Sequence, residues 1–90
     1  MAEPEWSVVL APAARRQLAA LPADIQRRVG RVIDGLAAQP RPHAAKLLSG
    51  DGSIWRVRVG DYRVLYEIRG VALVVLVVRI GHRREVYRSR

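Results

Sequence analysis

The sequence predicts a single α+β domain in which a two-helix hairpin packs on one face of a mostly antiparallel sheet. Between residues 11 and 36, apolar side chains recur at spacings of three and four, as in amphipathic helices. Between residues 54 and 69 they alternate with polar side chains, as in half-buried strands. The order of these patterns predicts an N-terminal strand, two helices and then an antiparallel meander of three to four strands.

The N-terminal half supplies the first strand and both helices. Residues 5–10 are rich in β-branched side chains and predict a short strand. Pro12 suits the first turn of a helix over residues 11–21, and Pro22 ends that helix and can begin the next. One apolar stripe of the second helix should pack on the sheet, and it comprises Ile25, Val29, Val32, Ile33 and Leu36.

The C-terminal half supplies the meander. Residues 38–53 contain two prolines and two glycines without periodicity, which predicts a surface connection. Three strands should follow over residues 54–59, 62–69 and 71–80, and a final short strand can include Val86 and Tyr87. The apolar run at 71–78 is too short for a membrane span, which needs about 20 residues, and therefore predicts a buried strand.

The composition limits the class of protein. Ninety residues fit one domain, residues 1–90. Cysteine is absent, which excludes disulfides and thiolate zinc sites and fits a reducing, cytoplasmic setting. His43 and His82 are distant and show no ligand spacing, so we expect no metal and no cofactor. The first residues, "MAEPEW", lack the apolar run of a secretory signal.

The charge of the chain is concentrated in its C-terminal part. The formal net charge is +8, and the sequence pI is about 11.4. Residues 1–53 carry seven Lys or Arg against five acidic residues, whereas residues 54–90 carry nine Arg against three. This excess indicates a polyanionic partner, either nucleic acid or an acidic protein. The alternative is a solvated basic surface.

The predicted hairpin "WRVRVGDYRVLYEI" brings like charges together. The "GD" at 60–61 suits a two-residue turn. That turn places Arg58 directly opposite Arg63, with Arg56 opposite Leu65 on the same face. Like charges directly opposite destabilise a strand pair, so this cluster makes physical sense if an anion completes it. The planar guanidinium fork suits phosphate oxygens.

Two alternatives to an anion site stay open. Glu67 and Glu85 can neutralise some of the arginines, and salt screens exposed like charges. The tail can also contribute, because it leaves the last long strand through Gly81 and can fold back beside the arginines. In that tail, His82 is either a general base or an exposed loop residue, and Tyr87 is either catalytic or packed at a sheet edge.

The sequence resembles a known family. The stretch "KLLSGDGSIWRVRVGDYRVLYEI", the hydrophobic strand after it and "GHRREVY" are similar to the RelE/ParE toxin superfamily of prokaryotic toxin–antitoxin systems. The likeness covers nearly the whole chain and implies a RelE-like, microbial-ribonuclease-like fold. RelE-like members are endoribonucleases that cut mRNA in the ribosomal A site. ParE-like members poison DNA gyrase and lack the ribonuclease residues, although both branches share the hairpin.

The resemblance implies a set of catalytic positions. Five positions of the RelE-like pattern carry suitable side chains, which favours the ribonuclease branch, and they are Arg56, Arg58, Arg63, Arg83 and Tyr87. The second-strand positions are often lysine in the family. Arginine cannot lose its proton, so Arg56 and Arg58 should stabilise charge and not act as bases. Tyr87 would activate or orient the 2′-hydroxyl in a metal-free reaction, and Arg83, or Arg84 in its place, would serve the leaving group.

The remaining expectations concern partners. Further residues should bind RNA, namely Lys46, Arg79, His82, Arg84 and Arg88. The resemblance implies a cognate antitoxin whose acidic, amphipathic segment wraps this domain, and mRNA on the ribosome as substrate. We expect no membrane and no small-molecule cofactor. The alternatives are a ParE-like gyrase inhibitor without nuclease activity and an inactive RNA- or protein-binding module.

Overall fold

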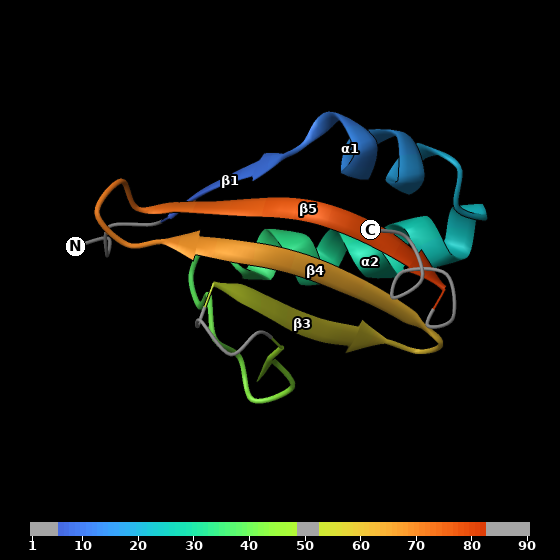
Figure 1. Ribbon diagram of the computed structural model, residues 1–90. Helices are drawn as coiled ribbons and strands as arrows, with labels where there is room; N and C mark the ends of the chain where they lie inside the picture. The colour runs from blue at the N-terminus through green and yellow to red at the C-terminus, as the bar shows by residue number, and fades with distance from the viewer. Residues whose placement is uncertain (1–5, 49–52, 83–90) are drawn as a thin grey trace.

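The computed structural model describes residues 6–48 and 53–82 (Figure 1). The helices are α1 (Pro12–Ala19) and α2 (Ala23–Gly35), and the strands are β1 (Ser7–Leu10), β2 (Lys46–Leu47), β3 (Ile54–Val59), β4 (Tyr62–Arg69) and β5 (Val74–His82). The strands form one sheet in the order β1-β5-β4-β3-β2. β1 runs parallel to β5, and the other pairs are antiparallel. The predicted α+β class and the mostly antiparallel sheet are confirmed.

Two prolines set the limits of the helices. Pro12 lies in the first turn of α1, where its missing N–H costs no hydrogen bond. Pro22 directly precedes α2, and Asp24 lies in the first turn of that helix, whose positive end favours a carboxylate. Figure 1 shows α2 running behind the sheet and α1 beside β5. Among the described residues, no helix is long and apolar enough to cross a membrane.

The core lies between the helices and one face of the sheet. Its buried side chains are Ala14, Val29, Ile33, Leu36, Val57, Val59, Val64, Tyr66, Val75, Val77 and Ile80. Each large apolar side chain buried in this way stabilises the fold by about 1.5–3 kcal/mol relative to exposure. The stripe predicted on the second helix therefore packs on the sheet, as do the alternating apolar residues of the hairpin.

The last long strand differs from its prediction at both ends. It begins at Val74, because the preceding residues form a turn in which Leu73 has a φ of 54°. It continues to His82, so Gly81 and His82 belong to the sheet and the prediction that they leave it was wrong. The two-residue strand β2 was not predicted. The short strand predicted at Val86 and Tyr87 lies outside the described residues.

Candidate functional site

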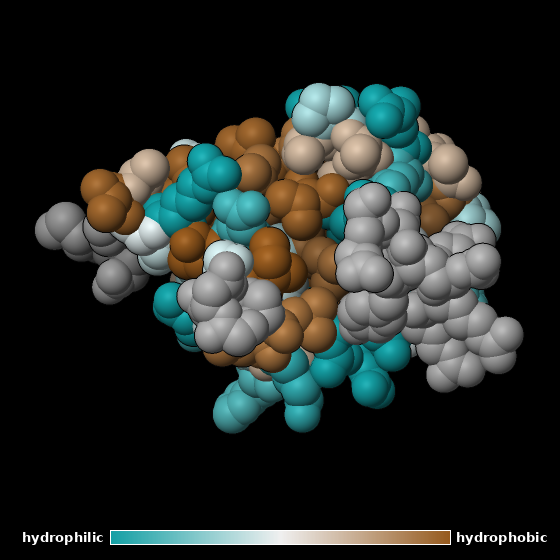
Figure 2. Space-filling model, viewed as in Figure 1, coloured by the Kyte–Doolittle hydropathy of each residue, from teal (hydrophilic) through white to brown (hydrophobic). Residues whose placement is uncertain are grey.

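The arginines of the hairpin lie on the sheet face that α2 leaves uncovered. We call this the open face, and it is turned toward the viewer in Figures 1 and 2. Side chains alternate along a strand, so the neighbours of the buried valines on β3 and β4 point to the open face. These neighbours include Arg56, Arg58 and Arg63. The face predicted for the three arginines is therefore correct.

The strand register arranges the basic residues in two adjacent rows across the sheet. One row joins Lys46 on β2, Arg56 on β3, Leu65 on β4 and Arg79 on β5. The next row joins Arg58 on β3, Arg63 on β4 and Gly81 on β5. The sheet thus brings together three predicted catalytic residues and two predicted RNA-binding residues. We call these five cations the basic cluster.

Arg63 is the least solvated member of the basic cluster. It faces Arg58 directly across the β3–β4 pair, and the predicted register is confirmed. The Arg63 side chain is only 8% exposed, and its Nε has no hydrogen-bond partner. Burying a charge without a counter-ion is costly, and a like charge directly opposite adds to that cost. The arrangement favours a bound anion at this point.

Acidic side chains of the described segments do not neutralise the hairpin arginines. The alternative in which Glu67 does so is not what the structure shows, because Glu67 pairs with its own strand neighbour Arg69. Arg69 donates from Nε and Nη2 to the Glu67 Oε1 atom at 3.2 and 3.1 Å. Within residues 6–48 and 53–82, no ion pair involves Arg56, Arg58 or Arg63. The second predicted neutraliser, Glu85, lies outside these residues.

The open face also carries an apolar strip beside the basic cluster. In Figure 2, hydrophobic side chains gather over β1, β5 and β4, and hydrophilic ones border them. The register places Val9 beside Leu76 and Ser7 beside Val74 on this face. Val9 is 45% exposed. A partner that covers this face would meet both apolar surface and positive charge.

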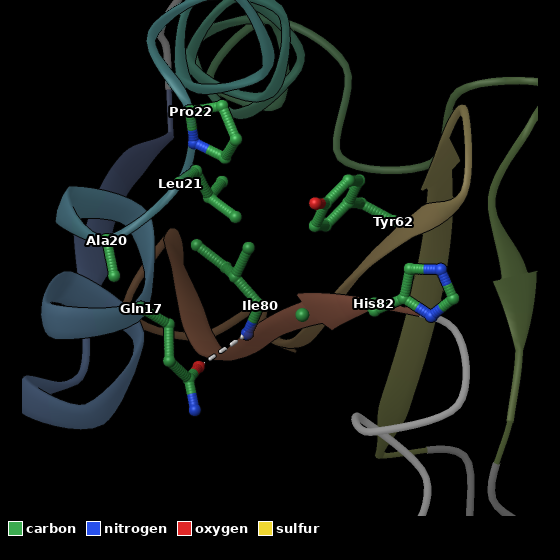
Figure 3. Close-up of a pocket in the computed structure, with 8 residues that line it drawn as sticks. Gln17, Ala20, Leu21, Pro22, Tyr62, Ile80 and His82 are labelled. Atoms are coloured by element: carbon green, nitrogen blue, oxygen red, sulfur yellow. Dashed lines mark hydrogen bonds between the residues drawn. The ribbon is translucent and has the colours of Figure 1, made fainter.

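His82 lies on the other side of the sheet from Arg63. It is the register partner of Tyr62, and the two rings meet edge to face, with centroids 5.7 Å apart and planes at 81°. Both rings line a hollow beside Leu21 and Pro22, in the turn between the helices (Figure 3). The structure therefore does not bring His82 together with the basic cluster.

Tyr66 serves the fold and not the basic cluster. Its side chain is fully buried, and its hydroxyl donates a 2.7 Å hydrogen bond to the carbonyl oxygen of Pro40. Burial raises the pKa of Tyr66 to about 12, and the nearby positive charge of Arg41 lowers it only in part. A hydroxyl with a pKa this high stays protonated near neutral pH. The bond ties the connection after α2 to the middle of β4.

Two contacts of arginine side chains were not predicted from the sequence. The guanidinium of Arg28 on α2 reaches the β3–β4 turn, where it lies against Gly60. Arg41 lies over the Trp55 ring at 5.4 Å from its centroid, a cation–π distance. Both pairs join residues far apart in the chain, so no local pattern signals them. The predicted residues Arg83, Arg84, Tyr87 and Arg88 lie outside the described residues.

Known proteins share this sequence pattern and fold. Residues 8–87 match the family described as the ParE toxin of type II toxin–antitoxin systems. The structure is similar to the RelBE2 toxin–antitoxin complex of Mycobacterium tuberculosis, with 29% identity and a TM-score of 0.76, covering 87% of this chain and 98% of that chain. It is also similar to the RelE–RelB complex of Pyrococcus horikoshii, with 27% identity and a TM-score of 0.78, covering 89% and 97%.

A third similar structure is the isolated RelE toxin of E. coli, with 22% identity and a TM-score of 0.77 over 92% of each chain. At this identity the likeness shows the fold alone. No match was found among curated proteins. The family match carries the ParE description, whereas these solved structures are described as RelE toxins or their complexes, so the comparisons leave the branch open. Because the family match covers most of the sequence, the chain belongs to the RelE/ParE superfamily of toxins from type II toxin–antitoxin systems.

Proposed function

We propose that this toxin is a ribosome-dependent, metal-free endoribonuclease that cleaves mRNA and so inhibits translation in the cytoplasm. The observation that carries the proposal is the buried Arg63, which faces Arg58 and has no acidic partner among the described residues. A phosphate would relieve the repulsion between the two guanidiniums and supply the missing counter-charge. The arrangement destabilises the free protein, and a polyanionic substrate would remove this cost by neutralising the two charges.

The arginines would act as fixed charges. Cleavage by an RNA 2′-hydroxyl adds negative charge at phosphorus, and Arg56, Arg58 and Arg63 would stabilise that charge in the transition state. A preorganised donor of this kind typically contributes a factor of about 10²–10³ in rate. Deoxyribose lacks the 2′-hydroxyl, so the reaction would select RNA over DNA. None of the three arginines can take the 2′ proton, because arginine stays protonated.

Proton transfer would come from the tail. We assign Tyr87 to activate or orient the 2′-hydroxyl. Arg83 would stabilise the leaving 5′ oxygen or donate a proton to it as a weak acid, with Arg84 as the alternative to Arg83. Guanidinium groups near a tyrosine favour its phenolate form. Such groups are poorly matched to neutral pH compared with a histidine, so the enzyme would depend on the ribosome to position its RNA.

The open face would also bind the cognate antitoxin. The M. tuberculosis and P. horikoshii proteins are described in complex with their antitoxins. A segment that covers the apolar strip and the basic cluster would need apolar and acidic side chains together, which means an acidic amphipathic peptide. It would exclude RNA from the arginines, and its association should weaken as salt rises.

The second candidate is a gyrase inhibitor, because the family that matches the sequence is described as ParE. Programmed ribosomes and a supercoiling assay with DNA gyrase distinguish the two. We expect the wild type to cut mRNA. Arg63→Gln and Tyr87→Phe should each cut it at least about 10²-fold more slowly. Arg31→Gln is the matched control, because Arg31 is exposed on α2. Uncut mRNA together with inhibited supercoiling would establish the ParE-like function instead.

A further inference from the structure

A hollow of about 400 Å³ lies at the end of the sheet, between the α1–α2 turn and the adjoining ends of β4 and β5 (Figure 3). Its helical side is formed by Gln17, Ala20, Leu21 and Pro22, and its sheet side includes Tyr62 and His82. The size lies within the range of small-ligand pockets, about 300–1,000 Å³. None of the roles assigned to the basic cluster uses this space.

The walls of the hollow suit a flat heterocycle. Leu21 and Pro22 offer apolar surface, and the Tyr62 and His82 rings meet edge to face at 5.7 Å. In Figure 3 the hydroxyl of Tyr62 points into the hollow. The Gln17 carbonyl oxygen accepts a 2.7 Å hydrogen bond from the Ile80 backbone, and this leaves the amide group as a donor. Aromatic faces with a few hydrogen-bonding groups are how proteins hold unstacked bases of single-stranded RNA.

The hollow adjoins the basic cluster through two residues. Gly81 lines it, and Gly81 is also the register partner of Arg63 on the open face. Tyr62 precedes Arg63 in β4. β1 pairs with β5 only from Val74 to Val77, and within residues 6–48 and 53–82 no other strand pairs with the outer edge of β5 near Gly81. A nucleotide with its phosphate at Arg63 can therefore turn its base around the end of the sheet.

We propose that the hollow binds one unstacked nucleobase of the RNA strand whose phosphate lies at Arg58 and Arg63. The inference rests on the proposed function and extends it, because a base-binding hollow makes the site selective for nucleotide identity as well as for charge. Phosphate contacts hold every RNA alike, whereas base contacts distinguish sequences. An apolar peptide side chain, the other plausible occupant, gains nothing from the Tyr62 hydroxyl or the Gln17 amide.

Binding of trinucleotides to the complete chain tests the proposal without requiring cleavage. The probes are RNA trinucleotides with 2′-O-methyl riboses, which cannot be cut, and each position carries each of the four bases in turn. Isothermal titration calorimetry should show a preference at one position. The preference would come from the Tyr62 hydroxyl and the Gln17 amide, because base edges differ in their hydrogen-bonding groups, and good hydrogen-bonded pairs discriminate between bases by about 5- to 150-fold. Equal affinity for all four bases at every position would overturn the proposal.

Two variants locate the selectivity. Ala20→Phe places a ring in the mouth of the hollow, whereas Ala19→Phe adds the same ring to an exposed helical residue outside it. We expect Ala20→Phe to lose the base preference but keep sequence-independent binding, and Ala19→Phe to behave as the wild type. Preference retained in Ala20→Phe would contradict the assignment. If Ala20→Phe does not fold, nuclear Overhauser effects between base protons and the Tyr62 ring of the wild type decide, and their absence rejects the site.

The outcomes separate this inference from the proposed function. Base-selective binding by a protein that cuts no mRNA on ribosomes would reject the nuclease and retain the hollow. An active nuclease that binds all trinucleotides equally, and whose cleavage sites are unchanged by Ala20→Phe, would retain the nuclease and reject the hollow as a base site. Cleavage-site preference that shifts in Ala20→Phe and not in Ala19→Phe supports both.

Discussion

Arg58 and Arg63 are direct register partners on β3 and β4, and Arg63 is almost fully buried. Directly opposite residues of an antiparallel pair have Cβ atoms about 4.5–5.5 Å apart, where like charges destabilise the sheet. Hydrophobic burial elsewhere in the sheet offsets this cost. Under the proposed function, a substitution that removes the Arg58 charge should therefore stabilise the free toxin and weaken its binding of an anion.

Replacing Arg58 by glutamine should stabilise the free protein. The substitution removes one of two facing like charges, and Arg58 is exposed, so no buried group loses a partner. Cross-strand pairs of this kind differ by about 0.2–1 kcal/mol, which sets the expected gain at low ionic strength. Salt should reduce the gain by screening the repulsion. Urea denaturation at low and high salt measures both effects.

The same Arg58→Gln variant should cut mRNA at least about 10²-fold more slowly, if the guanidinium stabilises the transition state. Arg31→Gln removes an equal charge from an exposed position on α2 and should change neither stability nor cleavage appreciably. A loss of stability in Arg58→Gln at low salt would show that the two guanidiniums do not repel each other in the free protein.

Tyr66 should make the fold less stable at alkaline pH. Burial raises its pKa to about 12, whereas a tyrosine in the unfolded chain titrates near 10. Between these values the folded protein binds more protons than the unfolded one, so the free energy of unfolding falls as pH rises. The contribution is complete below pH 10 and lost by pH 12, and amounts to about 2–3 kcal/mol.

Denaturation curves at closely spaced pH values from 9 to 12 measure this effect, with Tyr66→Phe as the control. The control loses the hydrogen bond to the Pro40 carbonyl and should be less stable than the wild type below pH 10. Its stability should fall less steeply than that of the wild type above pH 10, because the variant lacks the Tyr66 hydroxyl. Parallel curves for the two proteins would show that Tyr66 titrates as in the unfolded chain.

Gly60 should resist substitution for conformational reasons. It has a φ of +60°, the left-handed region that costs other residues about 1–2 kcal/mol. The added Cβ of Gly60→Ala would lie 3.4 Å from the Arg28 guanidinium, an ordinary contact, so the backbone sets the cost. Gly60→Asn should be tolerated better, because asparagine adopts this region more readily. Thermal unfolding followed by circular dichroism measures both changes.

Gly70→Ala is the matched control for Gly60→Ala. Its φ is not in the left-handed region, and an added Cβ would meet no atom within 4 Å. We expect its melting temperature to stay within a few degrees of the wild type. A similar loss in both variants would show that the left-handed turn is not what makes Gly60 necessary.

The hairpin could be predicted from the sequence because its information is local. Alternation assigns the faces of β3 and β4, and a two-residue turn fixes the register that places Arg58 opposite Arg63. The start of β5 could not be predicted in this way. The apolar run from residue 71 looks like a strand throughout, and a left-handed φ at Leu73 is not signalled by leucine.

The features that depend on distant residues were beyond local patterns. The strand β2 contains only Lys46 and Leu47, too few residues to show alternation. Alternation predicted the direction of Arg63 but did not predict that its side chain is only 8% exposed. The hollow combines residues of the α1–α2 turn with the ends of β4 and β5, and no spacing in the sequence joins them.

Gln17 should hold β5 in place through one hydrogen bond. The Ile80 backbone N–H, buried beyond the end of β1, donates to the Gln17 Oε1 atom at 2.7 Å. Gln17→Ala leaves that N–H without this acceptor, which typically costs about 1–3 kcal/mol. We expect a loss of stability of this size in urea denaturation and faster hydrogen exchange at the Ile80 amide.

The matched control for Gln17→Ala is Gln26→Ala. The Gln26 amide donates to the Leu18 carbonyl at 3.1 Å, but that carbonyl also accepts from the Leu21 N–H at 3.2 Å. The same truncation therefore leaves no backbone group without a partner and should cost less, about 0.5–1.5 kcal/mol. Equal losses in the two variants, or unchanged exchange at Ile80 in Gln17→Ala, would show that side-chain packing and not the hydrogen bond stabilises this end of β5.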